Sequence, residues 1–464
     1  MNNEPGSFRD PATTIFYVGD RVLRGLSEQA AADWAQLSAT SFFPRLIDEG
    51  KAVATREVDS GELPSVDVGA WALLLEHERI SFVSYPYEWT FEMLRDAAVL
   101  HLEILLAALD DGVTMKDGYA FNVQWRGAAP VFIDIGSFER LGAGGPWVGY
   151  RQFCQTFLYP LLLQAHLDIP FQRFLRGHLD GFEPHDMRQL FPGLRRFRKG
   201  VFRHVYLHSV MEARSTKGTE AVKKELRDAG FGAELTKATV TKLLKLVRGL
   251  RSKRSTSGWA AYRNTCSYTD ADREAKEGFV RSAVEDRRAH LVWDLGANDG
   301  AYSRLAAEHA DYVVAVDSDD VVIDALYRSL RQDGPGNVLP LVMNLVDPSP
   351  GRGWRGVERR AFTDRGRPDM VLGLALVHHL ALASNVPLAE VVAWLHSFGS
   401  PLVVEFVEPH DPMAARLLAN KPAGLFDDYR LEVFQQLLDK SFTIERRETL
   451  PSGSRTLYSA LPRA

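Results

Sequence analysis

Residues 291–300 constrain the fold more than any other stretch of the chain. The stretch starts as an apolar run that suits a buried parallel strand, and its glycines, Gly296 and Gly300, permit a sharp turn and close approach of a ligand. A second apolar run, 312–316, ends on Asp317, and an acid about 20 residues past the first glycine can hold a ribose diol. The order strand, turn, helix, strand therefore predicts a nucleoside site in a parallel α/β sheet.

The spacing within this stretch is Asp-x-Gly-x-x-x-Gly, so the Gly-x-Gly-x-x-Gly cradle of a dinucleotide pyrophosphate is missing. It resembles motif I of the class I S-adenosylmethionine-dependent methyltransferases. The resemblance implies a Rossmann-like domain that holds S-adenosylmethionine through Asp294, Gly296, Asn298, Gly300 and Asp317. This cofactor carries a sulfonium cation and no phosphate, which suits an acidic loop. The alternative is a glycine turn in an unrelated α/β protein.

Five further strands complete a predicted seven-stranded, mostly parallel sheet: 338–343, 369–376, 401–408, and an antiparallel edge formed by 442–445 and 455–458. Ligands bind such sheets outside the carboxyl ends of the strands. Polar residues stand at three of these ends: Asn344, the pair His378 and His379, and Glu405.

The methyltransferase resemblance implies that Asn344 contacts the adenosine. We expect His378, His379 and Glu405 to line an acceptor pocket, in which a histidine can serve as general base. The alternative is that one histidine packs and the other caps a helix. The spacing of these residues is not specific for a metal, and we expect none.

A helix is also expected just before residue 291, where it would cover the methionine end of the cofactor. Tyr268 and Lys276 can meet the cofactor's carboxylate there. A packing helix with a solvated lysine explains the same residues equally well.

The first 200 residues begin with a predicted hairpin over 13–24, a helix capped by Ser27, a strand over 80–84 and a long helix over 91–109. A second constellation then follows, comprising Asp117, Asn122 and, at the end of an apolar run, Asp134. Its order and spacing resemble the catalytic and metal-binding loops of the protein-kinase-like fold. The resemblance implies a proton-accepting Asp117, and magnesium–ATP held by Asn122 and Asp134.

This α+β domain departs from the kinase pattern in three ways. Met115-Lys116 replaces the usual His-Arg, Arg24 stands where a phosphate-gripping lysine is expected, and no glycine-rich loop precedes it. Arginine does not replace lysine freely. We therefore expect a degenerate kinase-like domain; the alternative reading is that its acids only cap turns.

Length and composition allow two or three domains of an ordinary globular protein: 464 residues, 45% hydrophobic and 25% charged. The net charge of −5 argues against nucleic acid as a partner, and no apolar run is long enough to span a membrane. Two cysteines, Cys154 and Cys266, give neither a disulfide framework nor a zinc spacing, as expected in the cytoplasm.

We predict a kinase-like domain over 1–205, a methyltransferase domain over 285–464, and between them, over 206–284, a basic helical linker with cofactor-covering helices. The stretches 84–89 and 132–138 also resemble a bacterial group related to rhizobial nodulation-associated proteins. That resemblance implies methylation of O or N on a small-molecule, envelope or glycan acceptor. A bifunctional kinase–methyltransferase and a non-enzymatic nucleoside-binding module are the alternatives.

Overall fold

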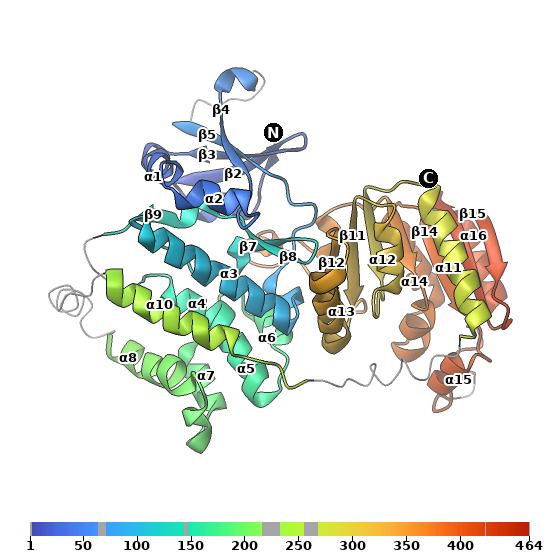
Figure 1. Cartoon of the computed structure of the whole chain (residues 1–464). Coiled ribbons are helices and arrows are strands. Elements are labelled where there is room, and N and C mark those ends of the chain that lie inside the picture. Colours follow the sequence, from blue (N-terminus) through green and yellow to red (C-terminus); the bar gives the residue numbers. More distant parts are fainter. Residues whose placement is uncertain are drawn as a thin grey trace. The chain divides into compact units, whose positions relative to one another are not determined.

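The computed structural model of the chain describes residues 2–63, 71–142, 147–215, 233–254, 268–422 and 424–463. The chain divides into two compact units, whose elements are labelled in Figure 1. Unit 1 comprises Met1–Trp125, Pro130–Arg254 and Gly351–Arg359, and unit 2 comprises Arg126–Ala129, Ser255–Pro350 and Arg360–Ala464.

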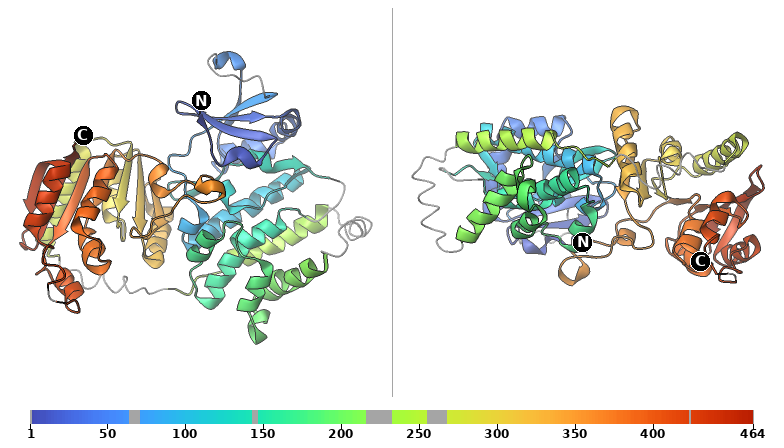
Figure 2. Two further views of the ribbon diagram at one scale, coloured as in Figure 1. Left: turned by 180° about the vertical axis from the view of Figure 1, so that it is seen from behind. Right: turned by 90° about the horizontal axis from the view of Figure 1, so that it is seen from below.

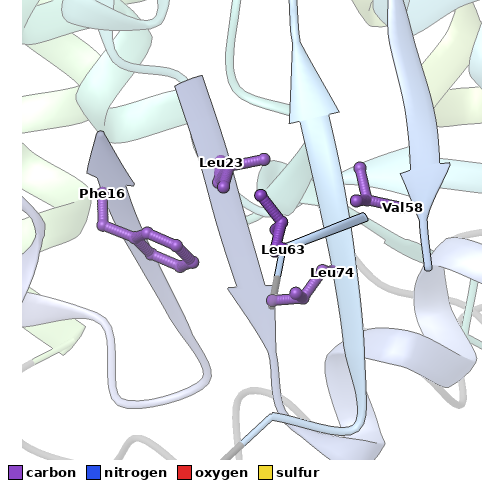
Figure 3. Close-up of a cluster of buried hydrophobic side chains, with 5 residues drawn as sticks. All are labelled: Phe16, Leu23, Val58, Leu63 and Leu74. Carbon is purple, nitrogen blue, oxygen red and sulfur yellow. The ribbon is translucent and has the colours of Figure 1, made fainter. Parts of the chain in front are cut away.

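Unit 1 begins with a five-stranded antiparallel sheet in the order β1-β2-β3-β5-β4. The strands are β1 (Asn2–Asn3), β2 (Thr13–Val18), β3 (Arg21–Leu26), β4 (Thr55–Val58) and β5 (Leu73–His77). Side chains from four of these strands and from the loop after β4 form the apolar cluster drawn in Figure 3: Phe16, Leu23, Val58, Leu63 and Leu74. This cluster is what holds the small sheet together, because burial of apolar surface is the main favourable term in folding.

The predicted hairpin and cap are both present. Gly19 adopts φ +60° in the turn between β2 and β3, a conformation that glycine reaches at little cost. The Ser27 side chain accepts a hydrogen bond from the backbone N–H of Ala30 at the start of α1 (Glu28–Ser38).

The strand predicted over 80–84 is wrong. Pro86 lacks the N–H that a ladder needs, and the carboxamide of Gln124 takes over the backbone of Ser84. The Gln124 side chain accepts from the Ser84 N–H at 2.9 Å and donates to the Ser84 carbonyl at 2.9 Å.

The remainder of unit 1 is mostly helical. The predicted long helix is present as α3 (Phe91–Asp110), and the other helices are α2 (Phe42–Asp48), α4 (Tyr150–Phe153), α5 (Tyr159–Leu167), α6 (Gln172–Gly177), α7 (Pro184–Leu190), α8 (His208–Ser215) and α10 (Ala233–Arg248). Two short strand pairs complete it: β6 (Val113–Met115) with β9 (Phe138–Arg140), and β7 (Val123–Arg126) with β8 (Ala129–Phe132).

Helix α10 lies within the stretch predicted as a linker, and the structure packs it into unit 1. It lies along α3 (Figures 1 and 2), with Val240, Leu243 and Val247 at most 1% exposed. Its Lys237 and Arg248 pair with acids of α3. The basic residues therefore form the outer face of an amphipathic helix that belongs to unit 1. The basic residues between positions 217 and 232, which also belong to the predicted linker, lie outside the described residues.

Unit 2 is built on a seven-stranded sheet in the order β12-β11-β10-β13-β14-β16-β15, as predicted. The first five are parallel and β16 is antiparallel to both of its neighbours. The strands are β10 (Leu291–Leu295), β11 (Tyr312–Asp317), β12 (Val338–Val342), β13 (Met370–Gly373), β14 (Leu402–Val407), β15 (Phe442–Thr449) and β16 (Arg455–Pro462).

The chain leaves β10 in one direction towards β11 and β12, and it passes from β13 to β14 in the other. Right-handed crossovers therefore put α12 and α13 on one face of the sheet and α14 on the opposite face. The helices are α11 (Asp270–Glu285), α12 (Ala301–Ala307), α13 (Asp320–Asp333), α14 (Leu388–Ser397), α15 (Pro412–Leu418) and α16 (Leu431–Ser441). The strand order reverses between β10 and β13, and sheets of this kind bind ligands at such a switch point.

Among the described helices, none combines the length and apolar character that crossing a bilayer requires.

Candidate functional site

The turn after β10 is fixed by backbone geometry. Gly296, Asn298 and Gly300 all adopt left-handed φ angles, of +83°, +50° and +77°. A Cβ at Gly300 would lie 2.5 Å from the Leu326 side chain, which would have to move, and the left-handed φ at this position favours glycine. The N–H groups of Gly296 and Ala297 both donate to the carbonyl of Val316, each at 2.9 Å, which ties the turn to β11.

Asp317 is held at the end of β11 by the same turn. One carboxylate oxygen accepts the N–H of Asn298 at 3.0 Å, and the other accepts the N–H of Asp319 at 3.0 Å. Burial raises the pKa of Asp317. The carboxylate is thus oriented by amide dipoles, and no cation of the described residues pairs with it.

A cavity of about 210 Å³ opens beside these residues at the carboxyl ends of β10 to β13. Its wall includes Gly296, Asn298, Asp317, Ser318, Asp319, Val322, Met343, Asn344, Leu345, Val346, Leu374, Ala375, Leu376, His379, Leu380, Ala383 and Ser384. No lysine or arginine occurs in this wall as the described residues form it. It therefore suits a neutral or cationic ligand better than a phosphate ester.

Asn344 stands at the mouth of the cavity and is exposed. Its side-chain oxygen accepts the N–H of Val346 at 3.1 Å, which fixes the loop after β12. The amide nitrogen of its side chain is the group that can meet a ligand.

Asp294 and Gly300, which were also predicted to hold the cofactor, do not belong to the cavity wall. Asp294 is 2% exposed and accepts a hydrogen bond from the Ser303 hydroxyl at 2.5 Å. Burial raises the pKa of Asp294 to about 6. In this arrangement Asp294 links β10 to α12 and Gly300 shapes the turn.

Tyr268, Lys276 and Glu405 meet in a buried cluster beside the cavity. Lys276 donates to Glu405 at 2.7 Å and to the Tyr268 hydroxyl at 2.7 Å, and that hydroxyl donates to Glu405 at 2.8 Å. Glu405 also accepts the N–H of Ala375, a cavity-wall residue with φ +50°, at 2.9 Å. Tyr268 and Lys276, predicted to reach the cofactor's carboxylate, have a carboxylate of the chain as partner.

Two members of this cluster were not predicted from the sequence. The Arg455 guanidinium lies 3.5 Å from Glu405 and 4.0 Å from the Tyr268 ring centroid, and it also donates to Asp411 at 2.9 Å. Glu405 is completely buried. The cations Lys276 and Arg455 and the acids Glu405 and Asp411 together carry no net charge. Despite its burial, the pKa of Glu405 is lowered, because Lys276 and Arg455 stabilise the carboxylate.

Glu405, predicted to line the acceptor pocket with the histidines, lies outside the cavity wall as the described residues form it. It holds the β13 turn that carries them. His379 lines the cavity, whereas His378 is 0% exposed with both ring nitrogens unpartnered among the described residues. The two ring centroids lie 4.0 Å apart. Burial lowers the pKa of His379 to about 4, so its imidazole is neutral at pH 7.

The kinase-like residues of unit 1 show a different arrangement. Arg24 is 4% exposed and donates to Asp134 at 3.0 Å and to His77 at 3.3 Å. A Cβ at Gly136 would lie 2.7 Å from the Arg24 guanidinium, so the chain leaves room for that group. Arg24 thus occupies one side of the Asp134 carboxylate, which the resemblance gives to magnesium.

Asp117 and Asn122 lie in the loop before β7. Burial, and then the charge of Asp134, raise the pKa of Asp117. The Asn122 side-chain nitrogen is a buried donor without a partner among the described residues. Within the same residues, no three histidine, cysteine or acidic side chains gather closely enough to hold a metal ion.

The comparisons with known proteins are as follows. No protein-family model matches the chain. The chain is 34% identical over 456 residues to the nodulation protein NoeA of Rhizobium meliloti (strain 1021), covering 98% of this chain and 95% of NoeA. The resemblance to nodulation-associated proteins is thereby confirmed.

Among solved structures, the chain is similar to the N-methyltransferase NodS from Bradyrhizobium japonicum WM9, with 12% identity and a TM-score of 0.31 over 42% of this chain and 98% of NodS. It is also similar to magnesium protoporphyrin IX methyltransferase (ChlM) from Synechocystis PCC 6803 with bound SAH. That likeness has 17% identity and a TM-score of 0.30 over 45% of this chain and 96% of ChlM.

Proposed function

Because the chain belongs to the family of the nodulation protein NoeA, we propose that its unit 2 is an S-adenosylmethionine-dependent methyltransferase. The acceptor in this proposal is a small molecule or a glycan with a reactive oxygen or nitrogen. The observation that carries it is the cavity at the sheet's switch point, which has the half-buried Asp317 at its wall and no lysine or arginine among the described residues that form it.

The residues at the cavity fit the proposed cofactor. Asp317 can accept hydrogen bonds from the ribose hydroxyls, since its two carboxylate oxygens together offer about four lone-pair sites and its donors within the described residues are the backbone N–H groups of Asn298, Ser318 and Asp319. Asn344 can pair with the adenine edge, and Gly296 lets the backbone approach the sulfonium side closely. An uncompensated carboxylate also favours a cationic sulfonium over a phosphate group.

Methyl transfer needs an electrophilic methyl group, which the sulfonium supplies when the cofactor is bound. His379 takes the proton that the acceptor loses, because it lines the cavity and is neutral above a pH of about 4. His378 is completely buried, and its ring packs against that of His379 from inside the protein.

Calorimetric titration with S-adenosylmethionine tests the cofactor site. We expect Asp317→Ala to weaken binding by about 100-fold or more, as loss of two hydrogen bonds to ionised oxygen implies. The matched control is Asp333→Ala, an exposed acid at the far end of α13. Equal affinity of a folded Asp317→Ala variant and the unmodified protein would remove Asp317 from the site.

Turnover separates an enzyme from a non-enzymatic nucleoside-binding module. Release of S-adenosylhomocysteine with fractions of bacterial extract as acceptor is expected to fall by roughly 100-fold or more in His379→Gln. In His378→Gln, whose ring does not reach the cavity, kcat is expected to fall less. Tight cofactor binding without turnover in any fraction would favour the binding module.

For unit 1 we propose a degenerate kinase-like domain that recognises the acceptor. The ion pair of Arg24 with Asp134 supports this proposal, because it gives the carboxylate a permanent cation of the chain's own. The rival proposal is a bifunctional kinase–methyltransferase that uses magnesium–ATP, in which Asp117, Asn122 and Asp134 have the roles that the kinase resemblance implies.

A further inference from the structure

An exposed segment of unit 1, residues 187–211, is unusually basic for this acidic chain. It contains six cations, Arg188, Arg195, Arg196, Arg198, Lys199 and Arg203, and no aspartate or glutamate, in a chain of net charge −5. Among the described residues, none of Arg195, Arg196, Lys199 and Arg203 forms an ion pair. Their positive charge is therefore available to an anionic partner.

The same segment exposes apolar side chains that monomeric proteins usually bury. Leu194 is 86% exposed, Met211 67%, Phe197 58%, and Phe202 and Leu207 40% each. They come from the turn after α7, the following helical turn and the start of α8. Apolar groups gathered on one segment mark an interaction site, whereas single exposed ones do not.

We propose that this basic, apolar segment binds the surface of an anionic lipid bilayer, with its apolar side chains in the interface and its arginines and lysine at the headgroups. Exposed aromatic and aliphatic side chains with Lys and Arg beside them are the composition of interfacial anchors. Polybasic segments are drawn to the negative surface potential of anionic lipids.

The ring geometry favours a bilayer over single-stranded nucleic acid. Phe202 stacks between Phe197 and Tyr206, with centroids 5.7 Å apart in both cases. Arg196 lies 4.8 Å from the Phe197 centroid, and Arg188 lies 4.5 Å from that of Tyr206. Bases bind aromatic platforms through open ring faces. Here ring and guanidinium groups already cover those faces, while the aliphatic groups of Leu194, Leu207 and Met211 stay exposed.

Flotation of the full-length protein with vesicles tests the proposal. We expect binding to vesicles of phosphatidylcholine and phosphatidylglycerol in a 7:3 ratio at low salt, with little binding to phosphatidylcholine alone. Arg195→Gln/Arg196→Gln/Lys199→Gln should weaken partitioning by roughly 100-fold, since each surface cation contributes about fivefold. Leu194→Ser/Phe197→Ser/Met211→Ser should weaken it about as much.

Control variants remove an equal charge, or exposed apolar groups, elsewhere. Arg328→Gln/Arg331→Gln/Lys440→Gln removes three exposed cations of unit 2, and Val148→Ser/Leu425→Ser removes exposed apolar groups. Both are expected to leave vesicle binding unchanged within about twofold. All the substituted side chains are exposed, so thermal unfolding should confirm folded variants.

Three results would overturn the proposal. The first is no binding to anionic vesicles at low salt. The second is equal loss in the control variants, which would reduce the effect to net charge. The third is a single-stranded oligonucleotide that displaces the protein from vesicles at stoichiometric concentration and binds in an Arg196-dependent way, which would assign the segment to nucleic acid.

Discussion

The two units each place an aspartate near the end of a strand, and the two carboxylates have different partners. In unit 1, Asp134 meets the guanidinium of Arg24 at 3.0 Å. In unit 2, Asp317 lines a cavity, and its partners within the described part of the chain are backbone N–H groups. A fixed cation neutralises the first carboxylate, whereas amide dipoles orient the second and leave its charge to a ligand. The partner of an acid, more than its place in a motif, indicates what the acid can bind.

The largest effect is expected where a buried charge set is broken. Glu405→Gln leaves Lys276 and Arg455 buried with only Asp411 to balance them, and this should destabilise unit 2 by about 3–5 kcal/mol. Urea unfolding, with hydrogen exchange of β14 to identify the transition, measures the change.

Two comparison variants sharpen this prediction. Glu405→Gln/Lys276→Met removes one charge of each sign and should recover about half of the loss. Glu277→Gln, whose partner Arg281 is on the surface, should cost less than about 1 kcal/mol. A Glu405→Gln cost as small as that of Glu277→Gln would mean that the cluster is hydrated.

The second prediction uses the pKa of Asp294, which burial raises to about 6 in the folded protein. The folded state then binds a proton more tightly than the unfolded state. Its contribution is fully present below the unfolded pKa of about 4 and is lost as pH rises through about 6. Stability of unit 2 should therefore fall by up to about 3 kcal/mol over this window.

Asp294→Asn should abolish that slope, because an amide does not titrate and its oxygen can still accept from Ser303. Urea midpoints at pH 4.5 and pH 7 measure the difference. A variant with the same pH dependence as the unmodified protein would show that another group titrates in this range.

Much of unit 2 was predictable from the sequence because its signals are local. The glycines after β10 mark a turn with positive φ, and apolar runs separated by helix-length intervals mark parallel strands. Asp317 could be placed at the ligand site because it ends a strand, and sheets of this kind bind ligands at the carboxyl ends of their strands. Asn344 and His379 line the cavity for the same reason.

The buried cluster was not predictable, since it depends on contacts far apart in the sequence. Glu405 and Arg455 are 50 residues apart and meet only because β16 runs antiparallel to β14. No local pattern marks Arg455 as buried, and arginine is mostly exposed in folded proteins. In unit 1 the same limit produced the wrong strand at 80–84, where the Gln124 side chain replaces a ladder.

The third prediction compares the two aspartates directly. Arg24→Met removes the cation from Asp134, which is partly exposed, so unit 1 should lose about 1–2 kcal/mol. Asp317→Asn should leave unit 2 within about 1 kcal/mol of the unmodified protein, because burial already disfavours that charge. Urea unfolding of both variants measures the two changes in the free energy of unfolding. Equal losses would mean that Asp317 has a cation partner after all.

The smallest effect is expected from magnesium–ATP on unit 1. Catalysis of phosphoryl transfer is mostly positioning and charge neutralisation of phosphates. Asp134 already has Arg24 as its cation, and no glycine-rich loop is available to hold the phosphates. In a thermal-shift titration, magnesium–ATP at 1–5 mM, on the order of typical nucleotide KM values or above, should move the melting temperature by less than about 1 °C. Arg24→Lys restores the lysine expected in a kinase, and of these variants it is the one in which magnesium–ATP should raise the melting temperature most. If the unmodified protein instead hydrolyses ATP in an acceptor-dependent way, and Asp134→Ala abolishes that activity, unit 1 is a working kinase and the contrast between the two aspartates fails.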